Sequence, residues 1–573
     1  MKTRRGQSKT LLGVVVVILV VLAAAAFMMR GGETTTTPAT TTGEETTTTT
    51  TTQTTEKATA PAAGPATTPA EQAPQETKTQ TTTTMTVAPG EKVVVVGTTD
   101  KITELDPANA YDFFTWEVLS NVMAGLVTYD PDTGDIVGDL AVSWEAQDNG
   151  KVWIFKLRKD AKFADGTPCT AKDVVRSIER VMGIQGDPSW LVTEFVDKVE
   201  AVDEYTVKFT LKQPTGYFLS VVATVPYFPV HPNYPQDEIV ADATWGGCGP
   251  YKIVEWKRDE KLVLEPNPYY YGEKPKNDKV IIRFFSDANS MRLALESGEI
   301  DVAWRTLTPQ DIKSLEQKGY NVVEVPGLFI RYVVLKTDAP PTDNKLVRQA
   351  LAAAIDRKEI AVRVFKGTVD PLYSMVPAGM WSHIDAFKDK YGDGNIELAK
   401  KLLREAGYSE SNKLKIQLWY TPTHYGDTED ELAAVLKEQW ERTGMITVEI
   451  MSSEWAQYVK QLREGQFMVS LLGWYPDYLD PDNYLTPFLK STANSWTGTG
   501  YANPTVDDLL TKAQVSTDKA EREQYYKQVQ EILAEDVPFI PLIQGKLYIV
   551  TQPDFKGLKV SPLMFLIYSS LEP

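Results

Sequence analysis

The chain has 573 residues, of which 24% are charged, and its formal net charge is −18 at pH 7. An acidic chain with no long basic run beyond its first residues is poorly suited to nucleic acid, so we expect no such partner. The three histidines are far apart and form no H-E-x-x-H pattern. We therefore expect neither a catalytic metal nor a cofactor.

An apolar segment near the start, residues 11–29, predicts a membrane anchor. About 19 apolar residues rise roughly 28 Å as a helix, which is enough to cross the hydrocarbon core of a bilayer. Basic residues precede the segment at Lys2, Arg4, Arg5 and Lys9, which predicts that this end stays in the cytoplasm. The remainder of the chain is then expected outside the cytoplasm, tethered to the membrane.

Other interpretations of this segment stay open. A cleavable secretory signal would use the small residues 23–26 as its cleavage site, although its apolar core would be unusually long. Residues 4–8 resemble the pilin-like signals of some archaeal surface proteins, which are cut before the apolar segment and keep it. No cysteine precedes Cys169, so a lipid cannot be attached here as in bacterial lipoproteins.

The next segment, residues 34–87, consists almost entirely of Thr, Pro, Ala, Gln and Glu. Such a composition cannot bury enough apolar surface to offset the entropy of ordering, so we expect a disordered spacer. Dense threonine with proline is also typical of O-glycosylated stalks. With or without sugars, the segment would hold a folded body away from the membrane.

The body that follows, roughly 480 residues, is large enough for two lobes and mixes strand and helix signals throughout. Residues 206–212 alternate strictly, which predicts a strand with Val207, Phe209 and Leu211 facing a core. The alternation at Trp153, Phe155 and Leu157 predicts an earlier strand. Together they indicate an antiparallel subdomain in the first third of the body.

Three apolar stripes at helical spacing predict helices further along the chain. We expect the first helix to be capped by Thr342 or Asp343. The stripes are Leu346, Val347, Ala350, Leu351, Ala354 and Ile355; then Leu432, Val435, Leu436 and Trp440; then Tyr525, Val529, Ile532 and Leu533.

Motifs for catalysis are absent from the sequence. We find no phosphate-binding glycine loop and no G-x-S-x-G, and Cys248 has no identifiable base beside it, so we expect no enzyme. Residues 130–135 resemble a calcium loop but lack the glutamate at its twelfth position, and we expect a surface turn. Cys169 and Cys248 form either a disulfide or two buried free thiols, and the sequence favours neither.

The order of short motifs along the body resembles the family 5 extracytoplasmic solute-binding proteins of ABC transporters, of the oligopeptide and dipeptide type. The stretches that carry this resemblance are LDP at 105–107, GLVTYD at 125–130, LAVSW at 140–144, FKLRKDAKF at 155–163, DGTP at 165–168, GPYK at 249–252, GEID at 298–301, VRQAL at 347–351, AGY at 406–408 and GWYPDYLDPDNYL at 473–485.

The resemblance implies an α/β fold of the large periplasmic-binding-protein class. Two lobes would close like a clamshell on a ligand, and lobe 1 would carry an extra subdomain. The expected parts are a signal or membrane anchor at 1–30, a disordered Thr-rich linker at 31–90, lobe 1 with the antiparallel subdomain at 91–330, lobe 2 at 331–540 and a return to lobe 1 at 541–573.

The GWYPDYLDPDNYL segment also implies a ligand site. Gly473 would let a ligand approach the backbone, while Trp474 and Tyr475 offer apolar faces with polar tips. In similar peptide-binding proteins, the aspartate three residues after this tryptophan holds the α-amino group of the peptide. That role falls on Asp477 here, and the alternative is an aspartate in a turn.

The far end of the ligand is predicted less sharply. Dipeptide-binding relatives resemble this chain around Trp419, but they follow it with an arginine that takes the peptide carboxylate. Here His424 and Tyr425 stand in that region instead. His424 would donate a hydrogen bond to a carboxylate or to a sugar hydroxyl, or it is simply an exposed residue of the loop.

We therefore expect a monomeric binding protein that captures extracellular peptides and delivers them to an ABC permease. An oligosaccharide ligand is the alternative, because sugar faces stack on tryptophans and the body contains several. Asp477 favours a peptide, since a peptide brings an ammonium group. A stalked surface enzyme or adhesin fits the sequence poorly.

Overall fold

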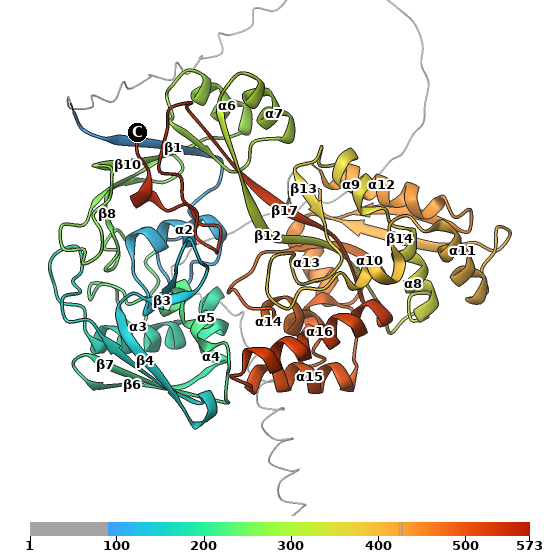
Figure 1. Cartoon of the computed structure of the whole chain (residues 1–573), viewed down its shortest axis with the longest axis horizontal. Coiled ribbons are helices and arrows are strands. Elements are labelled where there is room, and N and C mark those ends of the chain that lie inside the picture. The colour runs from blue at the N-terminus through green and yellow to red at the C-terminus, as the bar shows by residue number, and fades with distance from the viewer. Residues whose placement is uncertain (1–89, 423, 426–427) are drawn as a thin grey trace, which may run out of the picture. The chain divides into compact units, whose positions relative to one another are not determined.

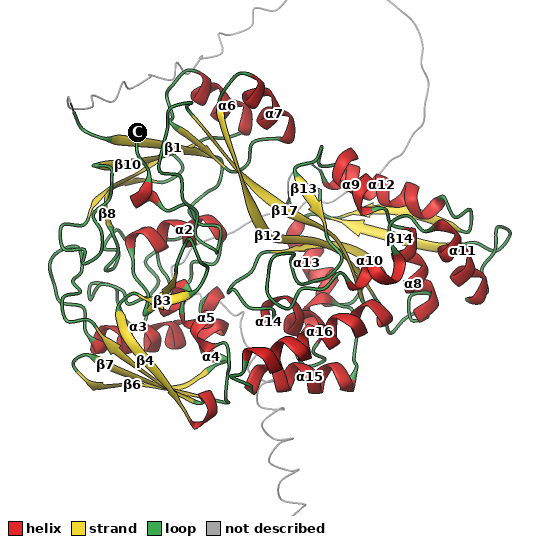
Figure 2. Cartoon of the chain, viewed as in Figure 1, coloured by secondary structure: helices red, strands yellow, loops and turns green. Residues whose placement is uncertain are grey.

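The computed structural model describes residues 90–573 except 423, 426 and 427. The predicted anchor at residues 11–29 and the Thr-rich linker lie outside this part of the chain. Among the described residues no helix is both long enough and apolar enough to cross a membrane. Helices and strands alternate over the described part, as Figure 2 shows, so the fold is mixed α/β.

One large mixed sheet runs through the protein in the order β15-β14-β16-β12-β17-β11-β1-β10-β9-β8, with β13 paired to β17. Its strands are β1 (Val93–Thr98), β8 (Tyr251–Lys257), β9 (Lys261–Pro266), β10 (Lys279–Phe284), β11 (Val302–Trp304), β12 (Asn321–Leu335), β13 (Val369–Pro371), β14 (Leu414–Tyr420), β15 (Ile446–Ser452), β16 (Val469–Trp474) and β17 (Phe539–Thr551).

Two smaller sheets complete the strands. The hairpin pairs β2 (Val127–Tyr129) with β3 (Ile136–Gly138), and the turn between them is held by Asp130, which accepts hydrogen bonds from the backbone of Asp132 and Thr133. The residues predicted to form a surface turn therefore do so. The other sheet has the order β4-β5-β7-β6, from β4 (Ala141–Gln147), β5 (Val152–Leu157), β6 (Val196–Asp203) and β7 (Thr206–Leu211).

This second sheet is antiparallel throughout, as the alternation of apolar residues predicted. Val207, Phe209 and Leu211 on β7 are fully buried, and Phe209 lies opposite Trp153 of β5. Their shared face packs on helix α3 (Ala171–Ile184). The predicted strands and their antiparallel pairing are thereby confirmed.

The remaining helices are α2 (Phe113–Val122), α4 (Trp190–Thr193), α5 (Phe218–Val222), α6 (Ala288–Glu296), α7 (Pro309–Gln317), α8 (Lys345–Ala354), α9 (Arg357–Arg363), α10 (Ala386–Tyr391), α11 (Ile396–Glu405), α12 (Glu429–Glu441), α13 (Trp455–Arg463), α14 (Asp482–Leu489), α15 (Pro504–Val515) and α16 (Lys519–Asp536). The three predicted stripes lie on α8, α12 and α16. The predicted cap of α8 was wrong: Asn344 caps it, because its side chain accepts the hydrogen bond of the Leu346 amide.

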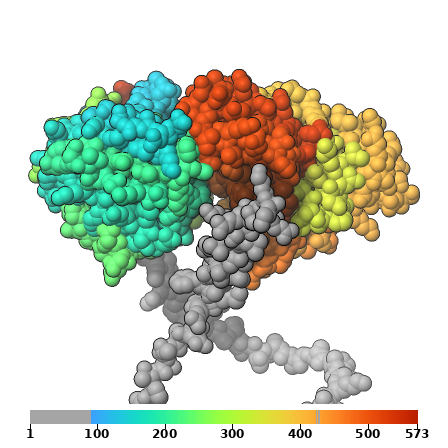
Figure 3. All heavy atoms as spheres, turned by 90° about the horizontal axis from the view of Figure 1, so that it is seen from below, coloured from blue at the N-terminus to red at the C-terminus, as the bar shows by residue number. Residues whose placement is uncertain are grey.

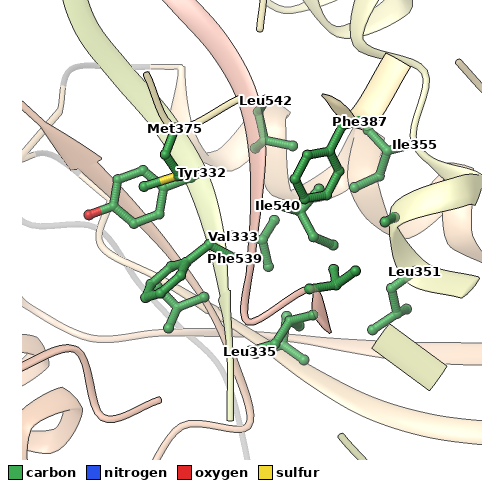
Figure 4. Packing of buried hydrophobic residues seen from close by; sticks show 14 of the residues in the cluster. Tyr332, Val333, Leu335, Leu351, Ile355, Met375, Phe387, Phe539, Ile540 and Leu542 are labelled. Carbon is green, nitrogen blue, oxygen red and sulfur yellow. The ribbon is translucent and has the colours of Figure 1, made fainter. Parts of the chain in front are cut away.

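Two large apolar cores divide these elements. The first core gathers side chains from β1, α2, the small antiparallel sheet and the C-terminal residues 547–571. The second gathers side chains from residues 330–543, and Figure 4 shows β12, α8, α10 and β17 meeting in it. We call the residues around the first core lobe 1 (90–329 and 544–573) and those around the second core lobe 2 (330–543).

Strands β12 and β17 are the long elements that run from one lobe into the other, as Figure 1 shows. They pair antiparallel, and their register shifts between Pro326 and Ile330 and again between Arg331 and Tyr332. At this irregular place Phe329 packs over Gly545, where any Cβ would stand 1.6 Å from the phenylalanine ring. Only glycine fits at 545, so the two strands can cross closely between the cores.

Candidate ligand-binding site

The segment between β16 and α14 carries Asp477 and is ordered by a buried hydrogen-bond network. Asn483, in the first turn of α14, is the centre of this network: its side-chain oxygen accepts from the Asp477 amide (2.9 Å) and from Trp474 Nε1 (3.1 Å). Its side-chain nitrogen donates to Asp477 Oδ2 at 3.1 Å. Asn483 therefore sets the direction in which the Asp477 carboxylate points.

A buried ion pair between α16 and this segment also holds the segment in place. Arg522 of α16 donates to Asp480 Oδ1 at 2.6 Å, and both side chains are almost fully buried. Asp482 is buried beside them, and the pKa of Asp482 is raised by burial first and by the nearby charge of Asp480 second. The positive charge of Arg522 therefore offsets the repulsion between the neighbouring carboxylates of Asp480 and Asp482.

Asp477 itself is 7% exposed and meets lobe 1 across the junction between the lobes. Its Oδ1 accepts a hydrogen bond from the hydroxyl of Tyr111 at 2.7 Å, although the two residues are 366 positions apart in the sequence. Burial raises the pKa of Asp477 to about 6, and the hydrogen bonds from Tyr111 and Asn483 only partly oppose this. Within the described residues no lysine, arginine or histidine pairs with it.

Aromatic side chains from both lobes surround this carboxylate. Tyr475 stacks on Phe329 at 5.1 Å between ring centroids and meets Phe113 of lobe 1 at 5.5 Å. Tyr111 and Tyr475 are 39% and 36% exposed, yet the pKa of each is raised, chiefly by loss of hydration. Water thus reaches these side chains although protein atoms surround them, which is the environment of a cleft between lobes.

Charged groups also stand near Tyr475. Arg305 of lobe 1 lies over the Phe113 ring at 4.1 Å and over the Tyr475 ring at 5.8 Å, and pairs with Asp100 at 3.2 Å. From lobe 2, Arg331 of β12 lies next to Gly473, its partner in the register of β16. Both guanidinium groups lower the pKa of Tyr475, against the larger effect of burial.

The structure brings four of the predicted residues together in one segment, Gly473, Trp474, Tyr475 and Asp477, and adds Tyr425. The Tyr425 ring lies over the Arg331 guanidinium at 3.5 Å and beside Gly473. Trp474 faces the other way from Tyr475, because its ring packs on Phe488 and Trp496 in the second core.

The two other predicted residues lie further out. His424 is exposed as a residue, but its ring stacks on Trp455 at 3.6 Å. The lost hydration of that ring lowers the pKa of His424 to about 4, with a smaller contribution from Arg331. Trp419 stacks on Phe467 inside lobe 2 and makes no ring contact or hydrogen bond with residues 473–477 in the described part of the chain.

Residues that the sequence analysis missed make half of the site. Tyr111 and Glu429 gave no local signal, because each acts on a partner distant in sequence. Asn483 lies inside the GWYPDYLDPDNYL motif, but its role as partner of Asp477 was not predicted. Arg331 did carry a local signal: it is a single charge within the apolar run FIRYVVL of a strand that turns out to be buried on both sides. A charged side chain is rarely buried in such a run unless it is paired or hydrogen-bonded.

The two cysteines lie together in a small buried cluster of lobe 1. Both are free thiols in the structure, and they are in hydrogen-bonding contact. Burial raises the pKa of Cys248 well above its usual value, and its contact with Cys169 raises it further. Such a thiol is a poor nucleophile.

The structure gives less support to a metal site and to a ligand site in a surface depression. In the described part of the chain no three His, Cys, Asp or Glu side chains gather as metal ligands. A surface depression of about 460 Å³ lies on lobe 1, lined by Asp242, Thr244, Val254, Glu255, Trp256 and Arg258. Its Trp256 and Arg258 both donate to Asp242, so its polar groups already satisfy one another. We therefore place the site at Asp477.

Known proteins resemble this chain over most of its length. Residues 135–496 match the family described as bacterial extracellular solute-binding proteins, family 5 Middle. The probable D,D-dipeptide-binding periplasmic protein DdpA of Escherichia coli is 29% identical over 83% of this chain and 93% of its own length. The dipeptide-binding protein DppE of Bacillus subtilis is 29% identical over 83% and 91%.

A solved structure shows the same fold. The periplasmic binding protein DppA from Helicobacter pylori, in complex with the peptide STSA, superposes with a TM-score of 0.70 and 27% identity. The match covers 84% of this chain and 98% of that one. The similarity therefore extends over both lobes.

Proposed function

Because this chain belongs to the bacterial extracellular solute-binding proteins of family 5, we propose that it captures peptides between its lobes and delivers them to the permease of an ABC importer. Its relatives are named as binding proteins, and the proposed role includes no chemical step. We infer a tether to the membrane through residues 1–30, with residues 31–90 as the spacer and a single body as the binding unit.

The observation that carries this proposal is the Asp477 carboxylate. It is buried, it has hydrogen-bond donors but no cation among the described residues, and it stands where Tyr111 and Tyr475 remain open to water. A buried carboxylate without a counter-charge is unfavourable, as its raised pKa indicates. The α-ammonium group of a peptide supplies the missing charge.

Closure of the lobes would form the complete site. Tyr111, Phe113 and Arg305 belong to lobe 1, while Tyr475 and Asp477 belong to lobe 2, so their contacts exist only when the lobes are together. Figure 3 shows the blue-to-green part of the chain and the yellow-to-red part as neighbouring masses. We propose that β12 and β17 bend near residues 330 and 540, close to the boundaries expected from the sequence (91–330, 331–540 and 541–573), so that lobe 1 and lobe 2 move as two bodies.

An oligosaccharide is the second ligand that the sequence left open. Trp474 and Trp496 pack on each other and on Phe488, and Trp419 packs on Phe467, so these rings are engaged within lobe 2. The aromatic surface between the lobes comes from tyrosine and phenylalanine instead. This arrangement favours a peptide, and the experiment below includes sugars as an outcome.

We expect peptides with a free amino terminus to raise the melting temperature of the purified protein. A ligand at a hundred times its Kd stabilises the folded state by about 2.7 kcal/mol. The measurement is a thermal-shift screen of peptides, the same peptides N-acetylated, and oligosaccharides. N-acetylated peptides serve as the control and should have little effect. A shift produced by oligosaccharides alone would exclude the peptide function.

Peptide affinity should also depend on pH. Burial between the lobes raises the pKa of Asp477 to about 6, and only its ionised form attracts an ammonium group. Acidification from pH 7 to pH 5 protonates most of this carboxylate, so Kd should rise about tenfold. Calorimetric titration at both pH values measures the change, with circular dichroism as the control that the protein stays folded. An equal Kd at both values would show that Asp477 does not bind the ligand charge.

A further inference from the structure

The two cysteines of the chain come from distant segments of lobe 1 and meet in one small apolar cluster. Cys169 is 3% exposed, and Cys248 is fully buried. Their thiols are in hydrogen-bonding contact. The buried side chains that pack around them are apolar: Ala124, Leu140, Ala161 and Phe163. Each thiol therefore faces the other in apolar surroundings.

The backbone before Cys169 is a short hairpin, which fixes the position of this cysteine. The Cys169 amide donates to the Ala161 carbonyl at 3.0 Å, and the Phe163 amide donates to the Thr167 carbonyl at 2.8 Å. Gly166 makes the turn with a φ of +91°, a backbone conformation that glycine adopts without strain. Cys169 is thereby held at the base of the hairpin, just before α3 begins.

The backbone around Cys248 wraps closely around the end of α2. The amides of Gly247 and Gly249 both donate to the Val122 carbonyl, at 3.1 and 3.3 Å. A Cβ at Gly249 would stand 2.6 Å from the backbone nitrogen of Met123, so only glycine fits there. We call residues 246–250 the α2 strap. Because Cys248 lies in the middle of this strap, the fold itself imposes the contact between the two sulfur atoms.

Two thiols in this arrangement are suited to oxidation. The family to which the chain belongs is extracellular, and disulfides form and persist in such oxidising surroundings. Burial raises the pKa of the Cys248 thiol, which makes it a poor nucleophile once the cluster has closed around it. A bond between the two thiols therefore forms while the chain folds, when both are still open to exchange.

We propose that Cys169 and Cys248 form a disulfide bond outside the cell. Each thiol loses its hydrogen as the S–S bond forms, and the two electrons pass by thiol–disulfide exchange to an oxidant disulfide, which is released as two thiols. The bond closes a loop of about 80 residues that contains α3, α4, β6, β7 and α5. It ties one half of the antiparallel sheet, with its helices, to the α2 strap, whatever ligand the protein binds.

The first test determines whether the bond forms. The chain is produced by export into a bacterial periplasm, where it folds in oxidising surroundings, and its intact mass is measured without reductant. We expect a mass about 2 Da below that of the reduced chain, because two hydrogens are lost. Iodoacetamide should label neither cysteine of the denatured protein until reductant is added. A fully reduced mass or a covalent dimer would overturn the proposal.

Thermal stability is the second readout. The same chain produced in reducing cytoplasm and kept in reductant should melt about 5–10 °C below the oxidised form, because the bond no longer restricts the unfolded chain. This comparison changes no side chain, so it creates no cavity. The variant Cys169→Ala/Cys248→Ala is the control for the reductant and should melt at the same temperature with and without it. A reduced form that melts with the oxidised form would contradict the tie to the α2 strap.

Limited proteolysis locates the effect within lobe 1. In the reduced form the bond no longer opposes local unfolding of the segment between the cysteines, so the first cuts should fall within residues 170–247. The oxidised form should resist cleavage there, while cleavage in lobe 2 stays equal in the two forms. Mass spectrometry of the fragments identifies the cut sites. Equal cleavage of residues 170–247 in both forms would contradict the proposed tie.

Discussion

Asp477→Asn should weaken peptide binding by about 30- to 5,000-fold. Removing one partner of a buried, hydrogen-bonded charge pair costs about 2–5 kcal/mol, because the ammonium group is left buried without its counter-charge. Asparagine has nearly the same volume, and its side-chain oxygen still accepts from Tyr111. Calorimetric titration with a peptide that shifts the melting temperature measures the loss.

Two comparisons show whether this loss reflects the ammonium group. N-acetylation of the peptide should weaken binding to the wild type strongly and should have little further effect on Asp477→Asn. Asp508→Asn removes an exposed carboxylate that pairs with Lys512 on the surface, and it should bind like the wild type. An unchanged Kd for Asp477→Asn would assign Asp477 to the turn alone.

The stability of the same variant distinguishes a binding residue from a structural one. Burial raises the pKa of Asp477 to about 6 in the folded protein, whereas an unfolded chain ionises near the usual value. Between the usual pKa of aspartate and pH 6, the unfolded chain is ionised at Asp477 more than the folded protein is, so rising pH favours the unfolded state. Above pH 6 the ionised carboxylate is buried in the folded protein and lowers the free energy of unfolding. Asparagine removes that cost, but its NH2 group then faces Asn483 Nδ2, which donates to Asp477 Oδ2 in the wild type. The variant should therefore lose less stability relative to wild type at pH 8 than at pH 5.

Arg522→Met should lower the free energy of unfolding by about 3–5 kcal/mol. The substitution leaves Asp480 buried without its cation, next to the buried carboxylate of Asp482. Methionine keeps much of the apolar volume of the arginine stem, so the loss reports the charge and the hydrogen bonds that Arg522 donates to the Ala513 carbonyl and the Tyr526 hydroxyl. Chemical denaturation followed by fluorescence measures it.

A double variant provides the control for this ion pair. Arg522→Met/Asp480→Asn removes both charges and should recover more than half of the lost stability, since neutral replacements of a complete buried pair are tolerated better than a broken pair. The single variant should also bind peptide more weakly, because the segment from β16 to α14 loses its support. A single variant as stable as the wild type would show that Arg522 is not what compensates Asp480.

The spacing of apolar residues predicted helices and strands well wherever buried side chains recur with a single period along the element. On β7 the alternation of Val207, Phe209 and Leu211 with polar residues corresponds to the two faces of an antiparallel strand. On α12 the stripe of Leu432, Val435, Leu436 and Trp440 is buried as a whole. The cap of α8 was placed one or two residues too early, because several polar residues precede the helix and the backbone selects among them.

The candidate site was predicted only in part, and for a different reason. Asp477 was identified by resemblance to peptide-binding proteins, since by itself it is one of several aspartates in a loop rich in proline. Nothing in the local pattern predicts that Tyr111 donates to it, because that hydrogen bond joins two lobes. The sequence likewise does not predict the partners of Arg331. Glu429, at the start of a helix, and Gly473, at the end of a strand, lie far from it along the chain.

The sequence by itself determined the class of the protein, its principal strands and helices, and the segment that carries the acidic group, since motifs, periodicity and composition are local properties. Tertiary structure alone decided which charges meet. The crossing of β12 and β17 brings Arg331 beside Gly473, and the junction of the lobes brings Tyr111 to Asp477. Such pairs depend on strand register and on the packing of distant segments, which no window of sequence contains.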